Sequence, residues 1–399
     1  MTLTVRRLEP ADAPAALRLG WEAFGVPPGA DLTGATVEGP GYVWFGAFDD
    51  NDDRTLVATA ADRAYDTWFG GRTVPTCGVA SVTVAAESRG AGAIGPLMRA
   101  MLTAARERGA VLSTLFPSAP RIYRRLGYEV ITSIGHVLVP STALAAVAAN
   151  GTTVRRAGAA DAAAIRGLYD RWAAGQNGPL TRRGPSFPGA DDADMVHSFT
   201  GVTLAVGVDG EPTGYASWIR GRGDDVERAL EVVDLIAVDA DATRALLRTL
   251  GSFSSVVGDV RLRTSGTDPV RLLLPTTAWS RVHEELYMLA VLDVEAALDG
   301  LPVPAGLSAT LGFTLSGSLL DGLDGSYQLT AGEGVLRCGR GSVGDDRSLD
   351  PRGLALLYAG AAPSGELRAL GLLRGGDPVE DVAWDALFAG RRPHVRDQF

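Results

Sequence analysis

A strand, a glycine-containing turn and a helix follow one another in the first third of the chain, and they constrain its fold most. The strand-like run Val79–Val84 leads into a turn with Arg89, Gly90 and Gly92, and a helix is expected from about Pro96 to Arg108. Glycine lets the backbone approach a ligand closely, and the free N–H groups of a helix N-terminus converge on an anion. Arg89 adds a positive charge that suits a phosphate oxygen. The segment therefore predicts a phosphate-binding turn in an α/β domain.

The same turn also fits a second class of cofactor. Gly90, Gly92 and Gly95 satisfy the G-x-G-x-x-G pattern of dinucleotide-binding proteins, which is a weak signal by itself. That fold requires a parallel strand before the turn and an acidic residue about 20 positions later. Here the strand follows expected antiparallel hairpins, and the next strand, Val111–Phe116, contains no acid. The context favours another phosphate-bearing cofactor, with a dinucleotide or a purely structural turn as the alternatives.

Helix and strand signals divide the chain into three parts. Residues 1–150 combine a helix capped by Asp12, an antiparallel meander interrupted by the acidic turn Asp49–Asp53, and the glycine turn. Residues 151–285 repeat this plan, but Asp239 to Ala242 stand where the arginine and glycines would be. Residues 286–399 have the shorter helices and strands of a small α+β domain. We therefore expect three domains, of which the second has lost its phosphate site. The strands expected in the first two parts are Tyr42–Phe48, Leu56–Tyr65, Thr76–Val84, Val111–Phe116, Thr203–Val208, Gly214–Ile219 and Leu230–Val238.

Composition limits the partners and the compartment. A net charge of −10 argues against nucleic acid, because phosphate binding needs a concentrated basic face. No apolar run is long enough to cross a bilayer, and the first residues show no secretory signal, so we expect a cytoplasmic protein without membrane partners. Cys77 and Cys338 lie far apart and the four histidines are scattered, so we expect neither a disulfide nor a metal, and no catalytic histidine.

Two short motifs resemble those of a known family. Arg89 and Gly92 occupy the two best-defined positions of the R-x-x-G-x-G/A motif of GNAT acetyltransferases, although Ile94 departs from its last small position. This departure, the segment Ile122-Tyr123-Arg-Arg-Leu-Gly-Tyr128, the repeated plan and the final phenylalanine resemble the Eis (enhanced intracellular survival) family over essentially all 399 residues. The resemblance implies two tandem GNAT-like domains, mixed sheets flanked by helices, followed by a sterol carrier protein-like domain. It also implies acetylation of amines such as aminoglycosides, lysine side chains or polyamines, and a homohexamer.

The resemblance further implies roles for individual residues. Val82 and Val84 would offer main-chain groups to the pantetheine arm of acetyl-CoA, while their side chains belong to the core. Tyr123 would be the general acid, although a tyrosine on a helix can equally be a packing residue. The terminal carboxylate of Phe399, which in most proteins is a frayed end, would be the base. The residues implied for the pyrophosphate are Arg89, Gly90, Gly92 and Ala93.

The acceptor site is the least defined part of the expected enzyme. Glu22 and Asp397 are candidates for recognising an ammonium group, with solvated surface charge as the alternative. Trp21 and Phe24 are candidates for the wall of the amine pocket, with core packing of the first helix as the alternative. Tyr128 is expected in the core. Two other functions stay open at this point, a nucleotide-dependent oxidoreductase that uses the glycine turn and a non-enzymatic lipid carrier built around the third domain.

Overall fold

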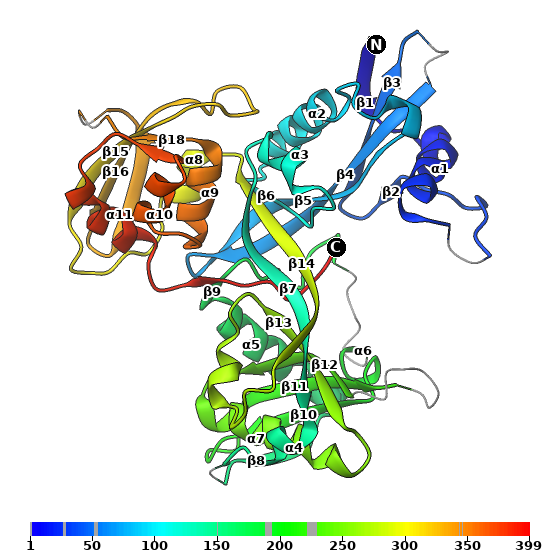
Figure 1. The fold of residues 1–399 in the computed structure, drawn as a ribbon, viewed down its shortest axis with the longest axis vertical. Coiled ribbons are helices and arrows are strands. Elements are labelled where there is room, and N and C mark those ends of the chain that lie inside the picture. Colours follow the sequence, from blue (N-terminus) through cyan, green and yellow to red (C-terminus); the bar gives the residue numbers. More distant parts are fainter. Residues whose placement is uncertain are drawn as a thin grey trace.

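The computed structural model describes residues 2–26, 29–51, 55–149, 151–187, 194–221, 230–342, 344 and 346–399. The chain forms three lobes, which we name by their position in the sequence (Figure 1). The N-terminal lobe holds β1 to β7, the central lobe holds β8 to β13, and the C-terminal lobe runs from α8 to α11. Of the expected acidic turn, Asp52 and Asp53 lie outside the described residues.

One sheet of 13 strands extends through the N-terminal and central lobes. Most neighbouring strands are antiparallel, and the two parallel pairs are β5 with β6 and β12 with β13. In spatial order the strands are β1 (Leu3–Arg7), β3 (Tyr42–Asp49), β4 (Thr55–Phe69), β5 (Arg72–Val84), β6 (Leu112–Leu115), β14 (Ser280–Val291), β7 (Glu129–Pro140), β13 (Asp259–Ser265), β12 (Leu230–Ala237), β11 (Pro212–Arg220), β10 (Gly201–Val206) and β8 (Thr153–Arg156), with β2 (Glu38–Gly39) paired to β3. The expected strands of both repeats are present, with ends that differ by a few residues.

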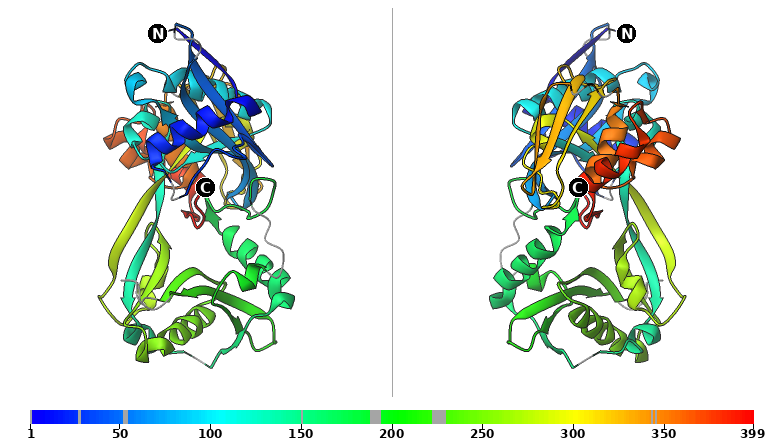
Figure 2. Two further views of the ribbon diagram at one scale, coloured as in Figure 1. Left: turned by 90° about the vertical axis from the view of Figure 1, so that its right-hand side faces the viewer. Right: turned by 90° about the vertical axis from the view of Figure 1, so that its left-hand side faces the viewer.

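Two long strands, β7 and β14, connect the lobes (Figures 1 and 2). β14 lies between β6 and β7, so a strand from residues 280–291 completes the sheet of the N-terminal lobe. The far end of β7 pairs with β13 of the central lobe. Neither β13 nor β14 was expected from the sequence, and β14 runs across residue 285, where we placed the start of the third domain. Its first half, SRVHEEL, is mostly exposed and polar, which hides the strand from a hydrophobicity pattern.

Helices cover the sheet in both lobes. The helix α2 shows the usual reason, because its buried side chains recur every three to four residues and form one apolar stripe, Leu97, Met98, Met101, Leu102 and Ala105. Asp12 does stand at the N-cap position of α1, but its carboxylate bonds Arg6 and the Glu9 amide instead of capping that helix. The helices of these two lobes are α1 (Ala13–Phe24), α2 (Ile94–Glu107), α3 (Pro120–Arg124), α4 (Ser141–Ala145), α5 (Ala162–Ala173), α6 (Asp194–His197) and α7 (Ala240–Gly251).

The C-terminal lobe packs directly on the N-terminal lobe. Buried apolar residues of the two lobes form a single cluster, in which the rings of Phe69 and Tyr358 stack with centroids 5.2 Å apart. The central lobe has two clusters of its own. The C-terminal lobe contains a five-stranded sheet in the order β17 (Val335–Arg340), β16 (Gly325–Gly332), β15 (Ala309–Leu315), β18 (Ser348–Leu349) and β19 (Leu373–Arg374), with α8 (Val294–Leu298), α9 (Pro351–Ala359), α10 (Ser364–Ala369) and α11 (Asp381–Phe388).

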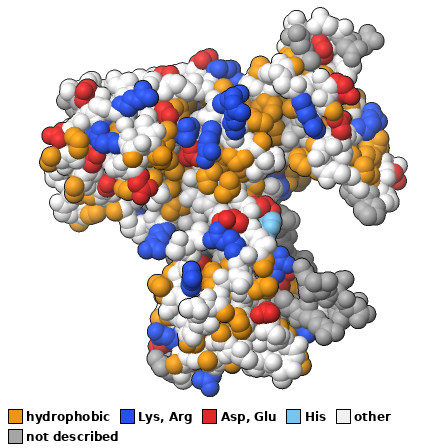
Figure 3. Space-filling model, viewed as in Figure 1, with side chains coloured by type: hydrophobic (Ala, Val, Ile, Leu, Met, Phe, Trp, Pro, Cys, Tyr) orange, Lys and Arg blue, Asp and Glu red, His pale blue; other side chains and the backbone are white. Residues whose placement is uncertain are grey.

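The C-terminal segment leaves this lobe and runs back to the point where all three lobes meet (Figures 1 and 2). On the way, β20 (Arg392–Pro393) pairs in parallel with β9 (Gln176–Asn177) of the central lobe. Arginine and acidic side chains are mixed over the face seen in Figure 3. No helix in the described part of the chain combines the length and the apolar character that crossing a membrane requires.

Candidate functional site

The turn between β5 and α2 is open to solvent and carries Arg89. Gly90 and Gly92 adopt φ angles of +81° and +87°, and a Cβ added at either would meet no described atom within 4 Å. Ala93 is the N-cap of α2, and no described side chain caps this helix, so its first N–H groups are available to a ligand. Arg89 is exposed beside them, with its Nε 3.4 Å from the carbonyl oxygen of Val84. These features suit a pyrophosphate.

Beside this turn, β5 separates from its parallel neighbour β6. The pairing ends at Gly78 and Thr114, whereas β5 continues to Val84. A bulge in β5 bends this free part, and Ser81 there adopts a φ of +51°, with its carbonyl oxygen accepting a hydrogen bond from Thr59 Oγ1 at 3.0 Å. The unpaired edge of β5 can accept an extended amide chain as an added strand would be accepted. The side chains of Val82 and Val84 pack against the core, as expected.

The parallel pairing of β5 and β6 corrects one argument from the sequence. As expected, β5 is antiparallel to β4, but it is parallel to its other neighbour, β6. The strand direction therefore does not disfavour a dinucleotide. The separation of the two strands and the lack of an acid in β6 do so instead, because the dinucleotide fold places an acidic residue after the next strand.

Tyr123 lies on α3 and faces the interior. Its side chain is 7% exposed, and its ring meets that of Tyr128 edge-on at 6.1 Å. Burial raises the pKa of Tyr123 to about 12, so its phenol stays protonated at neutral pH. No described group is hydrogen bonded to its hydroxyl, which leaves that hydroxyl free to act on a ligand. Tyr128 is fully buried, as expected.

A chain of contacts links these tyrosines to the separation of the strands. The Tyr128 hydroxyl lies 2.6 Å from Ser113 Oγ on β6, and Ser113 Oγ donates to the Cys77 carbonyl oxygen on β5 at 3.1 Å. Cys77 precedes Gly78, where the pairing of the two strands ends. Tyr128 is thus tied to the point where the two strands separate, and Tyr123 packs against its ring.

The ring of Phe399 fills the same place from the other side. It packs at 4.9 Å from the ring of Tyr65, at 5.4 Å from Phe116 and at 6.4 Å from Tyr287. A Cβ at Gly78 would come within 2.8 Å of Phe399 Cε2, so only glycine accommodates this ring. The last residue of the sequence is therefore docked in the N-terminal lobe, next to the cleft between β5 and β6.

The candidate acceptor residues of α1 have separate environments. The carboxylate of Glu22 accepts a hydrogen bond of 2.7 Å from the Ala86 amide, just after β5. It therefore holds the start of the glycine turn. Phe24 is 66% exposed, and Trp21 is half-buried, so neither belongs to the closed core of the lobe.

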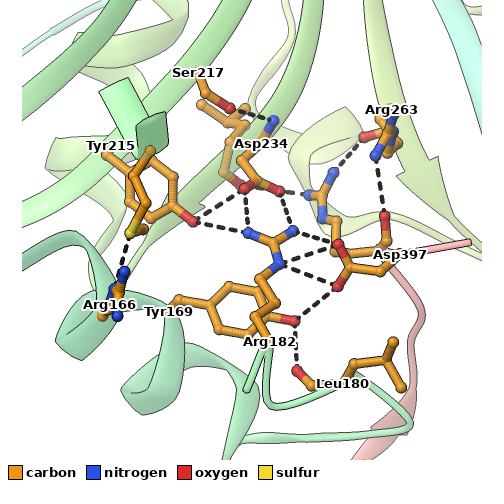
Figure 4. Close-up of polar contacts among 12 residues, drawn as sticks. Arg166, Tyr169, Leu180, Arg182, Tyr215, Ser217, Asp234, Arg263 and Asp397 are labelled. Atoms are coloured by element: carbon orange, nitrogen blue, oxygen red, sulfur yellow. Dashed lines mark hydrogen bonds and ion pairs between the residues drawn. The ribbon is translucent and has the colours of Figure 1, made fainter. Parts of the chain in front are cut away.

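Asp397 lies in a buried polar cluster of the central lobe (Figure 4). Arg182 stands between two carboxylates: its Nε is 3.0 Å from Asp397 Oδ1, and its Nη2 is 2.9 Å from Asp234 Oδ1. Two phenols complete the cluster, because Tyr169 donates to Asp397 and Tyr215 donates to Asp234. A cavity of about 460 Å³ opens beside it, and its wall combines apolar side chains such as Ile165 and Phe199 with the charged groups of the cluster.

The sequence did not point to Arg182 and Asp234. Asp234 offered one signal, an acid inside the otherwise apolar run Val232–Ala237, because a buried charge needs a partner. Arg182 offered none, since its partners are 52 and 215 positions away. Among the residues that the structure describes, no group of three or more histidine, cysteine or acidic side chains could hold a metal ion.

Comparisons with known proteins agree with this geometry. Residues 4–131 and 178–290 each match a family model described as an acetyltransferase (GNAT) domain, and residues 294–396 match a sterol carrier protein domain. These matches confirm the expected fold class.

Relatives match over most of the chain. It is 30% identical over 370 residues to an uncharacterized N-acetyltransferase of Streptomyces avermitilis, which covers 84% of this chain and 83% of that protein. It is 28% identical over 347 residues to N-acetyltransferase Eis of Mycobacterium tuberculosis, covering 80% and 79%.

Solved structures show the same three-lobed fold. A GCN5-related N-acetyltransferase from Kribbella flavida matches with a TM-score of 0.79 and 28% identity, over 100% of this chain and 98% of the other. Eis1 of Mycobacterium abscessus matches in fold with a TM-score of 0.75 and 22% identity, over 99% and 100%. Of the functions left open by the sequence, the comparisons favour the N-acetyltransferase.

Proposed function

Because the chain belongs to the Eis-like family of GNAT N-acetyltransferases, we propose that it transfers the acetyl group of acetyl-CoA directly to a primary amine, in a ternary complex. One observation carries this proposal. The gap between β5 and β6 has the glycine turn at one end and Tyr123 and Phe399 at the other. A donor seated at the turn would extend toward these two residues.

The residues of the gap fit coenzyme A. Gly90, Gly92 and Ala93 would present main-chain N–H groups to the pyrophosphate, and Arg89 would add its guanidinium. The main chain of Val82 and Val84 would pair with the amides of the pantetheine arm. When bound, acetyl-CoA supplies an acetyl group activated as a thioester.

Tyr123 and Phe399 would divide the proton transfers. The protonated Tyr123 hydroxyl would donate to the sulfur of the departing thiol, and the burial that raises its pKa also favours the neutral form of a thiol held beside it. The terminal carboxylate of Phe399 would accept a proton from the acceptor amine. Its role depends on the docking of the ring, which places the end of the chain at the cleft.

The acceptor would be a small-molecule or peptide amine, as with aminoglycosides, polyamines and lysine side chains. Trp21, Glu22 and Phe24 would form part of its entrance, because α1 lies next to the start of the glycine turn. We further propose a homo-oligomer, a hexamer by family resemblance, which the molar mass in solution would test.

Thiol release from acetyl-CoA over a panel of aminoglycosides, polyamines and lysine peptides tests the activity. No lysine of the chain itself competes as an acceptor, since all 37 Lys and Arg residues are arginine. We expect release that depends on an added amine, with the acetylated product identified by mass spectrometry. Inactivity toward every amine, despite saturable binding of acetyl-CoA, would contradict the proposal.

A further inference from the structure

The central lobe keeps the strand arrangement of a cofactor cleft. β12 and β13 are parallel, as β5 and β6 are, and their pairing ends at Val232 and Leu262. β12 continues to Ala237 before α7 begins, just as β5 continues before α2. The two repeats therefore share a gap between parallel strands that leads to a helix N-terminus.

The phosphate end of this second gap is closed by the chain itself. Asp239 is the N-cap of α7, and its carboxylate accepts a hydrogen bond of 2.7 Å from the Ala242 amide. The first helix turn also carries Asp241. The Ala242 amide is thus occupied by a carboxylate of the chain itself, and Asp241, which pairs with Arg244 at 3.1 Å, is a second acid in this turn. The turn before α2 has no such cap among the described residues.

The gap itself is filled by the C-terminal segment. Arg396 is 3% exposed and bridges the two separated strands, with Nη1 2.6 Å from the Arg263 carbonyl oxygen on β13 and Nη2 3.4 Å from the Leu235 carbonyl oxygen on β12. Arg263 returns a hydrogen bond of 3.2 Å to the Arg396 carbonyl oxygen. The Val395 amide donates to Ser265 Oγ at 2.9 Å. The segment lies where a pantetheine arm would lie in an intact repeat.

The next residue is held by the buried polar cluster of Figure 4. Arg182 pairs with Asp397 and Asp234, and adopts a φ of +54°, a conformation that L residues avoid unless their contacts enforce it. Burial would raise the pKa of Asp234, but the adjacent Arg182 lowers it below its ordinary value, so the Asp234 carboxylate stays charged beside that guanidinium. Tyr169 adds a hydrogen bond to Asp397. Asp397 is therefore fixed two residues before Phe399.

We propose that the second repeat has become the binding site of the C-terminal segment. Its former cofactor gap binds Arg396 and its polar cluster binds Asp397. Phe399 is thereby held at the cleft of the N-terminal lobe. Arg396, Asp397 and Arg182 are then positioning residues for the reaction. The proposal rests on the proposed function only for its effect on turnover. It also implies that each chain binds one coenzyme A.

The first test measures the docking without any reaction. Carboxypeptidase A removes an exposed terminal phenylalanine, and mass spectrometry follows the loss of Phe399. We expect slow release from the wild type, and release faster by about tenfold or more in Arg396→Met and in the milder Asp397→Asn, because both free the segment. Arg155→Met is the matched control, since Arg155 pairs with Asp161 in the same lobe, away from the segment. Equal rates in the wild type, Arg396→Met and Asp397→Asn would overturn the proposal.

The second test distinguishes the binding of the C-terminal segment by the central lobe from the catalytic role of Phe399. In both variants we expect kcat to fall about tenfold or more, with the KM for acetyl-CoA nearly unchanged, because the donor site is in the other lobe. Faster release of Phe399 with normal kcat would support the binding of the C-terminal segment by the central lobe, and it would exclude Phe399 from the mechanism. If the wild type acetylates no amine, the proposed function is wrong, but the release rates of Phe399 still test whether the central lobe binds the C-terminal segment. Titration calorimetry with coenzyme A should give one site per chain, and two sites would overturn the filled gap.

Discussion

At the scale of single residues, variants of the neighbouring Tyr123 and Tyr128 distinguish a catalytic role from a packing role. We predict that Tyr123→Phe lowers kcat by about a hundredfold with little change in the KM for acetyl-CoA, because general acids contribute about 10²–10⁴-fold. Tyr128→Phe is the matched control: it loses the contact with Ser113, which costs about 1 kcal/mol of stability, but it should keep its turnover. Steady-state kinetics and thermal unfolding of both variants decide this. Normal turnover in Tyr123→Phe would place the acid elsewhere.

Arg89 should act on binding of the donor. We predict that Arg89→Ala raises the KM for acetyl-CoA by about tenfold, since a charge-assisted bond to phosphate is worth about 1.5–3 kcal/mol, and that kcat changes little. Arg99→Ala is a suitable control, because Arg99 lies on α2, directly after the turn of Arg89, but bonds the Leu319 carbonyl oxygen of the C-terminal lobe. Equal effects of the two variants would mean that Arg89 acts only through general charge.

Sequence reasoning reached those site residues that lie close together in the chain. The glycine turn was identifiable because Arg89, Gly90 and Gly92 lie within four positions of one another, and the structure gives Gly90 and Gly92 positive φ angles with open space beside them. The polar cluster of Arg182, Asp234 and Asp397 was out of reach, since pairing between residues more than 50 positions apart leaves no local pattern. The roles of Tyr123 and Phe399 came from resemblance alone, and the experiments above test them.

At the scale of elements, the C-terminal segment is the part on which the mechanism depends most. We predict that one glycine added after Phe399 lowers kcat strongly without changing the melting temperature, because it moves the carboxylate but leaves the ring contacts with Tyr65 and Phe116 in place. Kinetics and thermal unfolding of the extended chain check this. Unchanged turnover would exclude the terminal carboxylate as the base.

The junction of β7, β13 and β14 should be sensitive to acid. His136 on β7 lies opposite Arg263 on β13 and His283 on β14. Burial, with Arg261, Arg263 and His283, lowers the pKa of His136 to about 4, against a smaller opposing effect of Glu285. Glu231 is the other carboxylate near the ring, at 3.7 Å.

The sign of the effect on stability follows from that lowered pKa. As pH falls, the unfolded chain binds the proton first, near pH 6.5, so the contribution of neutral His136 is full above this pH and is lost toward pH 4. We predict a loss on the order of 1–3 kcal/mol across this window. Thermal unfolding between pH 4.5 and 7.5 measures it, and His136→Gln should reduce the pH dependence, leaving the share of His394, whose pKa is also lowered. An unchanged slope in His136→Gln would contradict the assignment.

At the scale of the whole molecule, the order of strands differs from the order of the chain in a way that affects folding. The sequence predicted three consecutive domains, because the repeated plan is local. It could not show that residues 280–291 return to the first sheet, since the polar first half of β14 hides its pairing with β7. We propose that the folding unit of the N-terminal lobe includes this strand.

The consequence is that residues 1–150 should not fold by themselves. Without β14, the strands β6 and β7 have no partner between them, and the contacts of Tyr287, Met288 and Leu289, each 0% exposed, are lost. Burying each of these side chains is worth about 1.5–3 kcal/mol, so the total is comparable to the stability of a whole domain, about 5–15 kcal/mol. We predict that residues 1–150 alone show no cooperative thermal transition by circular dichroism. Joining residues 280–291 to them by a flexible linker should restore one, and Leu289→Asp in the joined chain should abolish it again. A cooperative transition in residues 1–150 alone would show that the first repeat is independent of the strand that now completes it.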